Sequence, residues 1–340
     1  MKKQYDNIQL MRGIASLSVV FMHIQMVANG AFGVELFFCI SGFIMMHVTE
    51  KNSDHFILKR AIRIVPLYWL ATFAMAALLI IMPSMFRTLE FRPSFLIKSL
   101  FFIPYFYTGE SGSTVNSLVQ VGWTLVMEIF FYFIFFAASK IKRESRHIIS
   151  SAVLALMVII GLVFNETESD FINFYCQPII LEFAFGMLSY RFLIRAGVEN
   201  PQYKPSAATR IICISVAAVI WAGLFAQKYF SVFDNVDRFI KYGIPAFAVF
   251  VLLFKGLENC KIPKALVVLG DISYSLYLTH SFVVQGFSRL IYNIDKFSIT
   301  GVALTAFLVL PLTVAVAWIF WWLIENKFTS FLRKKLIKQG

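Results

Sequence analysis

Long runs of apolar side chains recur along this chain and restrict the folds open to it. Windows of roughly 17 to 25 mostly apolar residues are long enough to span a membrane as helices. They occur at approximately 10–28, 31–48, 61–82, 117–139, 148–164, 172–194, 210–230, 239–257, 266–287 and 299–324. With 59% hydrophobic and only 15% charged residues, the chain is too apolar for a soluble domain. We predict an all-α, polytopic integral membrane bundle of about ten transmembrane helices.

The net charge of +12 is distributed as in a membrane protein and not as in a nucleic-acid-binding protein. If the N-terminus is cytoplasmic, most of the 31 Lys and Arg residues fall on the cytoplasmic side, which is the asymmetry that orients membrane proteins. An even number of spans then returns the C-terminus to the cytoplasm. We therefore expect both termini to be cytoplasmic and no nucleic-acid partner.

No feature of the sequence divides the chain into separate domains. It has no linker, low-complexity segment or soluble appendage, so we expect a single transmembrane domain over residues 1–340. The four cysteines are scattered and lack the spacing of metal ligands. They are Cys39, Cys176, Cys213 and Cys260. Neither a disulfide nor a metal site is implied.

Arg12 and His23 lie inside the first apolar window, where ionisable side chains are costly and usually functional. Eleven residues of α-helix turn through about 1100°, so both side chains share one face about 16 Å apart along the axis. The alternative is that Arg12 reaches the lipid phosphates and His23 is an ordinary hydrogen-bonded polar residue.

Glu35 is expected at the same membrane depth as His23, because each lies six residues from Asn29 in the predicted turn. A carboxylate beside an imidazole fixes its tautomer and stabilises the imidazolium formed when the ring accepts a proton. We predict contact between these two side chains. A salt bridge that only holds the hairpin together is the alternative.

Arg60 and Arg63 lie three residues apart at the inner end of the third window, hence on one helix face, with Lys59 adjacent. Arginine binds phosphate through two parallel hydrogen bonds, so this group is a candidate site for a polyphosphate ligand from the cytoplasm. The alternative is a plain basic anchor at the inner membrane face.

Polar side chains also follow single faces of two later windows. The fourth window carries a stripe that ends in a carboxylate: Ser117, Gln120, Thr124 and Glu128. Such a stripe should face a cavity lined by protein. The ninth window places Ser273, Tyr277 and His280 on one face. His280 either contacts substrate or makes a hydrogen bond between helices. Glu182 lies near the middle of the sixth window.

The order of these motifs resembles the membrane-bound acyltransferase family 3, from residue 5 to about residue 325. The motifs are Met11 to Ala15 followed by His23, Gly33 to Phe38 running into Ser41 to Phe43, Arg60 and Arg63, Gly122 to Leu125 with Glu128, Leu181 to Phe183 with Gly186, and Ser273 to Leu278 with His280. Each motif alone is weak, but their number and order make the resemblance specific.

The resemblance implies a ten-helix enzyme of the bacterial inner membrane. Such an enzyme passes an acyl group, usually acetyl from acetyl-CoA, to a hydroxyl of an exopolysaccharide or a lipid-linked O-antigen sugar. Acetyl-CoA is then the acyl donor, with no permanently bound cofactor. The expected partners are acetyl-CoA, the carbohydrate acceptor and the lipid bilayer.

Roles for the individual residues follow from combining the resemblance with the spacing. We assign catalysis to His23, Glu35 and Glu128, donor binding to Arg12, Arg60, Arg63 and Lys59, and acceptor binding to Tyr277, His280 and Trp123. His23 acts as general base, or it forms an acetyl-histidine intermediate. The sequence leaves both routes open.

The chain departs from the family pattern in two ways. The proline often found after the last span is missing from Glu325-Asn326-Lys327, and the hydrolase-like domain that some relatives carry is not expected here.

The competing function is transport, because a proton-coupled transporter or polysaccharide flippase also uses buried Glu and His. Carriers often show an internal repeat, and this chain shows none that we would defend.

Overall fold

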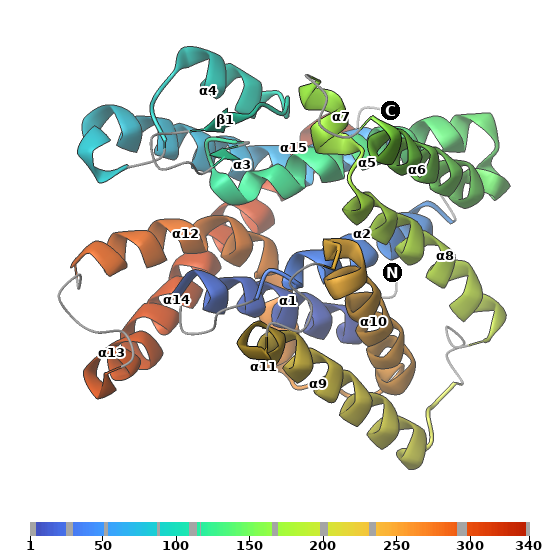
Figure 1. The fold of residues 1–340 in the computed structure, drawn as a ribbon. Helices are drawn as coiled ribbons and strands as arrows, with labels where there is room; N and C mark the ends of the chain where they lie inside the picture. Colours follow the sequence, from blue (N-terminus) through green and yellow to red (C-terminus); the bar gives the residue numbers. More distant parts are fainter. Residues whose placement is uncertain are drawn as a thin grey trace. The chain divides into compact units, whose positions relative to one another are not determined.

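Helices form almost all of the structure, which is a computed structural model of the whole chain (Figure 1). It describes residues 5–24, 30–50, 54–86, 89–108, 114–115, 117–164, 169–197, 203–230, 236–290 and 298–337. The chain divides into two compact units, Met1–Asn52 with Pro178–Trp318 and Ser53–Gln177 with Ile319–Gly340. The predicted all-α polytopic class is confirmed.

The first unit holds the N-terminal hairpin and most of the C-terminal half. Its elements are α1 (Asp6–Ile24), α2 (Gly33–Thr49), η4 (Pro178–Ile180), α8 (Leu181–Arg195), α9 (Ala207–Phe230), η5 (Phe239–Gly243), α10 (Ile244–Leu257), α11 (Lys264–Asp271), α12 (Ser273–Leu290), α13 (Ile299–Leu304), η6 (Thr305–Val309) and most of α14 (Leu310–Phe320). The elements η5 and η6 are short π-helical segments.

The second unit holds the middle of the chain and its C-terminal end. Its elements are α3 (Phe56–Ile81), η1 (Pro83–Met85), α4 (Pro93–Leu100), β1 (Tyr107–Thr108), β2 (Thr114–Val115), η2 (Gln120–Gly122), α5 (Trp123–Ile141), η3 (Arg143–Ser145), α6 (Arg146–Val163), α7 (Asp170–Tyr175), η7 (Trp321–Phe328) and α15 (Thr329–Ile337). The strands β1 and β2 pair antiparallel, with Tyr107 opposite Val115.

The structure divides two of the predicted apolar windows. The window 172–194 is interrupted at Pro178, which lacks a backbone N–H and separates α7 from α8. The window 266–287 bends by 70° between α11 and α12. In the described residues, six helices are long and apolar enough to cross a membrane, or seven if the bent pair is one span. The count near ten and the cytoplasmic termini stay predictions.

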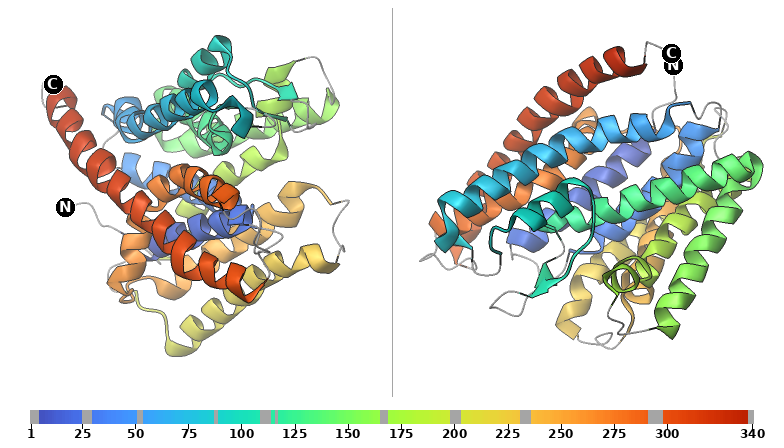
Figure 2. Two further views of the ribbon diagram at one scale, coloured as in Figure 1. Left: turned by 90° about the vertical axis from the view of Figure 1, so that its left-hand side faces the viewer. Right: turned by 90° about the horizontal axis from the view of Figure 1, so that it is seen from above.

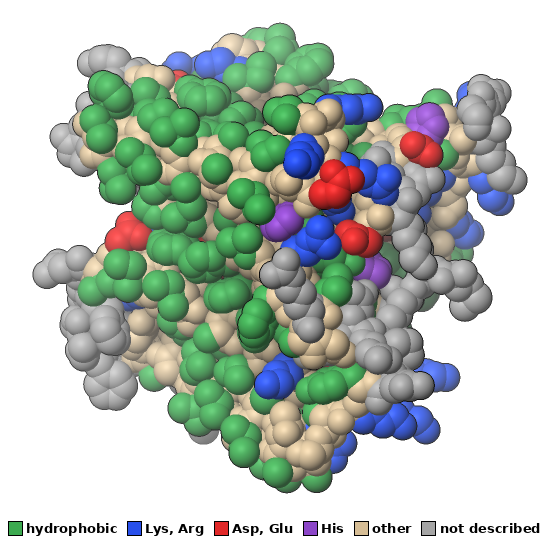
Figure 3. Space-filling model, turned by 90° about the vertical axis from the view of Figure 1, so that its right-hand side faces the viewer, with side chains coloured by type: hydrophobic (Ala, Val, Ile, Leu, Met, Phe, Trp, Pro, Cys, Tyr) green, Lys and Arg blue, Asp and Glu red, His purple; other side chains and the backbone are tan. Residues whose placement is uncertain are grey.

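Large apolar side chains are exposed along the long helices, as the face in Figure 3 shows. Ile81 of α3 is 72% exposed, Leu162 of α6 68%, and Val219 of α9 72%. A water-soluble protein rarely exposes apolar patches of this extent. Lipid is the solvent that these surfaces fit, and the chain is a multi-pass membrane protein.

The helices α2 and α8 approach each other closely because each presents a glycine to the other's backbone (Figure 1). A Cβ atom at Gly42 would collide with the carbonyl oxygen of Phe183, and one at Gly186 with the carbonyl oxygen of Cys39. Small residues at membrane helix interfaces permit this kind of packing. The rings of Phe38 on α2 and Phe183 on α8 stack on each other at the same helix interface, with centroids 4.4 Å apart.

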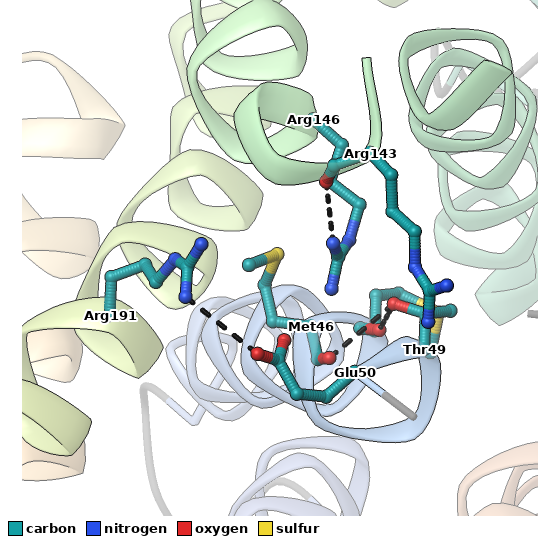
Figure 4. Close-up of polar contacts among 7 residues, drawn as sticks. Met46, Thr49, Glu50, Arg143, Arg146 and Arg191 are labelled. Atoms are coloured by element: carbon teal, nitrogen blue, oxygen red, sulfur yellow. Dashed lines mark hydrogen bonds and ion pairs between the residues drawn. The ribbon is translucent and has the colours of Figure 1, made fainter. Parts of the chain in front are cut away.

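The same two helices are linked again at the C-terminal end of α2 (Figure 4). Arg191 of α8 lies 3.7 Å from the carboxylate of Glu50, and both side chains are more than a third exposed. A pair so accessible to solvent contributes roughly 0–1 kcal/mol. The glycine contacts are therefore the stronger determinant of how α2 and α8 pack.

We expect Gly42→Ala to lower the thermal unfolding midpoint of the purified protein, because the added methyl must displace the Phe183 backbone. Overpacking of this kind costs about 1–3 kcal/mol. The matched control is Gly223→Ala on α9, where a Cβ meets nothing within 4 Å. Alanine should be neutral or slightly stabilising there. Equal midpoints for the two variants would contradict close packing at Gly42.

Candidate active site

His23 lies in the last turn of α1 with its ring half-buried. Its Nδ1 atom is 2.9 Å from the carbonyl oxygen of Val19, one turn earlier. A carbonyl only accepts hydrogen bonds, so Nδ1 carries the proton in this contact. In the neutral ring, Nε2 is then the nitrogen that can accept a proton from another molecule.

His280 of α12 packs against His23, with ring centroids 4.7 Å apart and an edge-to-face angle of 69°. The ring is fully buried, and its Nδ1 donates to the carbonyl oxygens of Tyr277 at 2.7 Å and Leu276 at 3.2 Å. Its Nε2 has no hydrogen-bond partner among the described residues. The two histidines are therefore held in the same way, each by carbonyls of its own helix.

Glu35, in the first turn of α2, forms an ion pair with Arg238, which directly precedes η5. The Arg238 Nε donates to Oε1 at 2.6 Å, while the Glu35 side chain is 0% exposed and that of Arg238 is 40% exposed. A carboxylate removed from water needs a nearby cation, and Arg238 supplies a full positive charge.

The prediction that Glu35 contacts His23 is wrong. Within the described residues, Glu35 is hydrogen-bonded to Arg238, and the ring of His23 lies against His280. Equal distance from Asn29 gives similar depth but not the direction in which each helix turns its side chains. Asn29 itself lies outside the described residues.

Glu182, in the first turn of α8, is a second fully buried carboxyl group close to this ion pair. Both of its oxygens lack a hydrogen-bond partner among the residues that the structure describes. The charges of Glu35 and Arg238 both act on it, and a Cβ at Gly243 would lie 2.5 Å from its Oε1. Two buried carboxyls therefore share the field of one guanidinium.

Arg12, one of the predicted donor-binding residues, belongs to a polar chain that reaches the bend between α11 and α12. Its Nη1 donates to Gln9 Oε1 at 3.1 Å, and Gln9 Nε2 donates to Asp271 Oδ1 at 2.8 Å. Asp271 is the last residue of α11, at the 70° bend. Arg12 is thus fixed beside a break in the helix and does not project freely into lipid.

In the second unit, Arg60 of α3 lies over two aromatic rings. Its Cζ is 5.8 Å from the Phe56 ring centroid and 5.9 Å from that of Tyr132 on α5. The Tyr132 hydroxyl donates to Glu128 Oε1, so the predicted Glu128 belongs to this group. The Arg60 Nε is buried and has no hydrogen-bond partner among the described residues. The group contains a guanidinium that can bind a further acceptor.

Three further residues with predicted roles belong to the second unit, namely Lys59 and Arg63 of α3 and Trp123 of α5. Lys59 Nζ donates to the Asp54 carbonyl at 2.7 Å, and Trp123 is the first residue of α5. The first unit holds the other predicted residues: Arg12, His23, Glu35, Tyr277 and His280. The sequence did not single out Arg238. The one signal for it was the need of a buried Glu35 for a cation.

Comparison with known proteins places the chain in a family. The family model described as "Acyltransferase domain" matches residues 5–322. The exopolysaccharide production protein ExoZ of Rhizobium meliloti is 34% identical over 264 residues, which is 75% of this chain and 77% of that protein. The chain belongs to this acyltransferase family, as its motifs indicated.

More distant relatives cover a similar share of the chain. The putative acetyltransferase ORF330 of Acidianus two-tailed virus is 25% identical over 82% of this chain and 84% of its own length. The O-acetyltransferase OatA of Staphylococcus aureus is 23% identical over 81% of this chain, which spans only 51% of OatA. No solved structure matches the chain.

Removing one member of the ion pair should destabilise the first unit. We expect Arg238→Gln to cost roughly 2–5 kcal/mol, toward the lower end because the guanidinium is 40% exposed. Replacing both members, in Glu35→Gln with Arg238→Gln, should recover part of that loss, because no uncompensated buried charge remains. Thermal unfolding of Glu35→Gln, Arg238→Gln and the double variant checks this. Additive losses in the double variant would contradict the pairing.

Proposed function

We propose that this acyltransferase moves an acetyl group from acetyl-CoA to a hydroxyl of a bacterial exopolysaccharide or a lipid-linked O-antigen sugar, at the inner membrane. Family membership supports acyl transfer. The printed names of the relatives support the finer statement, since one is an exopolysaccharide production protein and another an O-acetyltransferase. The acceptor class is carried over from these names.

The observation that carries the proposal is the arrangement of His23. Its Nδ1–H is held by the Val19 carbonyl at 2.9 Å, and the ring is half-buried. A general base needs a fixed ring and an accessible Nε2 lone pair. His280 packs against this ring at 4.7 Å and limits its rotation.

The proposed reaction balances without any other reactant. His23 Nε2 takes the proton of the acceptor hydroxyl while that oxygen attacks the thioester carbonyl carbon. The resulting tetrahedral intermediate collapses and the carbon–sulfur bond breaks. The leaving CoA thiolate takes the proton from the imidazolium, so the ring is neutral again. In the covalent variant, Nε2 itself attacks the thioester and CoA leaves as the thiolate. The sugar hydroxyl then attacks acetyl-histidine and its proton passes to that thiolate, so the products are the acetylated sugar, CoA and the free imidazole.

The donor and the acceptor are bound by different groups of side chains in this proposal. Arg60 and Arg63, with Lys59, bind the phosphates of CoA, because guanidinium groups bind phosphate through two parallel hydrogen bonds. Arg12 contributes a further positive charge toward the donor. Acceptor binding is assigned to Tyr277 and His280 of α12, whose ring centroids lie 6.2 Å apart, and, from the sequence pattern alone, to Trp123.

The two predicted catalytic carboxylates act as positioning residues. Glu35 holds the Arg238 guanidinium at 2.6 Å, so its effect on the reaction passes through that charge. Glu128 accepts from the Tyr132 hydroxyl and so holds the ring of Tyr132 in place, and the Arg60 guanidinium lies over that ring. Glu128 therefore acts on the donor-binding arginine.

The test is acetyl transfer by the purified protein in detergent, measured as CoA release with an oligosaccharide acceptor. We expect His23→Gln to lower the turnover rate by about 10²- to 10⁴-fold, because a positioned general base contributes that much. The control is His55→Asn at the exposed residue before α3, whose φ of 52° asparagine tolerates. Its activity should match the wild type.

Two outcomes would overturn parts of the proposal. If His23→Gln keeps more than about a tenth of the activity, His23 is not the base. If the wild type neither binds acetyl-CoA nor releases CoA, the donor is wrong and a carrier function is favoured. The assay distinguishes the two functions because protein in detergent has no compartments to transport between, so any release of CoA reports acyl transfer.

A further inference from the structure

The C-terminal helix α15 brings a third arginine toward the arginines of α3. The helices α3 and α15 pack against each other within the second unit (Figure 2). Thr329 of α15 is buried, and Arg333 lies one turn further along the same face. Unlike Thr329, Arg333 is exposed and can reach a ligand. Its charge acts on both Arg60 and Arg63.

This group has a surplus of positive charge among the described residues. Three guanidiniums, those of Arg60, Arg63 and Arg333, lie within one another's electrostatic field, and Glu128 is the carboxylate that acts on Arg60. Like charges repel, so they stay together at a cost unless an anion joins them. The buried Arg60 Nε also lacks a hydrogen-bond partner in the described part of the chain. A phosphate group, with about two negative charges, fits this surplus.

We propose that Arg333 is a third phosphate-binding residue beside Arg60 and Arg63, so that one phosphate is held by helices from opposite ends of the second unit's sequence. This inference rests on the proposed function, in which acetyl-CoA is the donor and supplies the phosphate. Lipid headgroups carry the same chemistry. The binding experiment therefore uses protein in detergent without added lipid.

A matched control lies on the same helix. Lys335 is two residues beyond Arg333, which turns it by about 200° to the opposite face. It is exposed like Arg333 and carries the same charge. A basic residue that only anchors the helix at the membrane surface would behave alike at both positions. A residue that binds a phosphate ligand should instead lower CoA binding only when position 333 is substituted.

The experiment measures equilibrium binding of CoA to the purified full-length protein. We expect Arg333→Gln to weaken CoA binding about tenfold, or about 1.4 kcal/mol. Lys335→Gln should stay within about twofold of wild type, a difference below about 0.5 kcal/mol. Arg333→Lys, which keeps the charge but loses the planar fork, should fall between wild type and Arg333→Gln. Circular dichroism and the thermal unfolding midpoint of each variant check that the protein remains folded.

The possible failures can be told apart. If Arg60→Gln weakens CoA binding while Arg333→Gln matches Lys335→Gln, the inference is wrong and the donor assignment stands. A second series measures binding of phosphatidylglycerol to the same variants. The inference is also wrong if Arg333→Gln weakens binding of this lipid but leaves CoA binding unchanged, since Arg333 then binds lipid phosphate. If the wild type binds no CoA, the donor assignment fails and the inference fails with it.

Discussion

The cost of removing charge from water determines how the first unit is built. A buried carboxylate is tolerated only beside a cation, and the Glu35 side chain, 0% exposed, meets Arg238 at 2.6 Å. Glu182 lies in the same field with both oxygens lacking hydrogen bonds among the described residues. These groups come from α2, α8 and the segment before η5, so their pairing requires all three segments to meet. An apolar protein keeps such groups at a cost in stability, which is the usual reason to attribute function to them.

Close helix packing makes this meeting possible. The glycines at 42 and 186 let the backbones of α2 and α8 touch, and Glu35 and Glu182 lie in the first turns of these two helices. The helix α1 packs against both α2 and α12, and α12 carries His280 to the ring of His23. The base and the buried charges therefore depend on one set of helix contacts. A substitution at either glycine should therefore disturb both the packing around His23 and the Glu35–Arg238 ion pair.

Sequence patterns predicted the class of fold, and which side chains share a helix face, because membrane spans and helical faces are local properties. The shared face of Tyr277 and His280 on one helix followed from helical spacing. The proximity of Arg60 to Glu128 joins two different helices, and the sequence did not predict it. The partner of Glu35 could not be predicted in this way. Arg238 lies 203 residues away, and only tertiary packing brings it to α2. The bend at Ile272 and the interruption at Pro178 likewise divide windows whose hydropathy alone looks continuous.

A neutral His23 ring, protonated at Nδ1 and bare at Nε2, is what general-base catalysis requires. Nuclear magnetic resonance of the purified protein with isotope-labelled histidine reads the protonation of each ring nitrogen directly, and His23→Gln identifies the His23 signals. The contact of Nδ1 with the Val19 carbonyl at 2.9 Å predicts the Nδ1-protonated neutral tautomer at the pH at which the enzyme is active. A ring protonated at Nε2 at that pH, whether as the other tautomer or as imidazolium, would contradict a general-base role for His23.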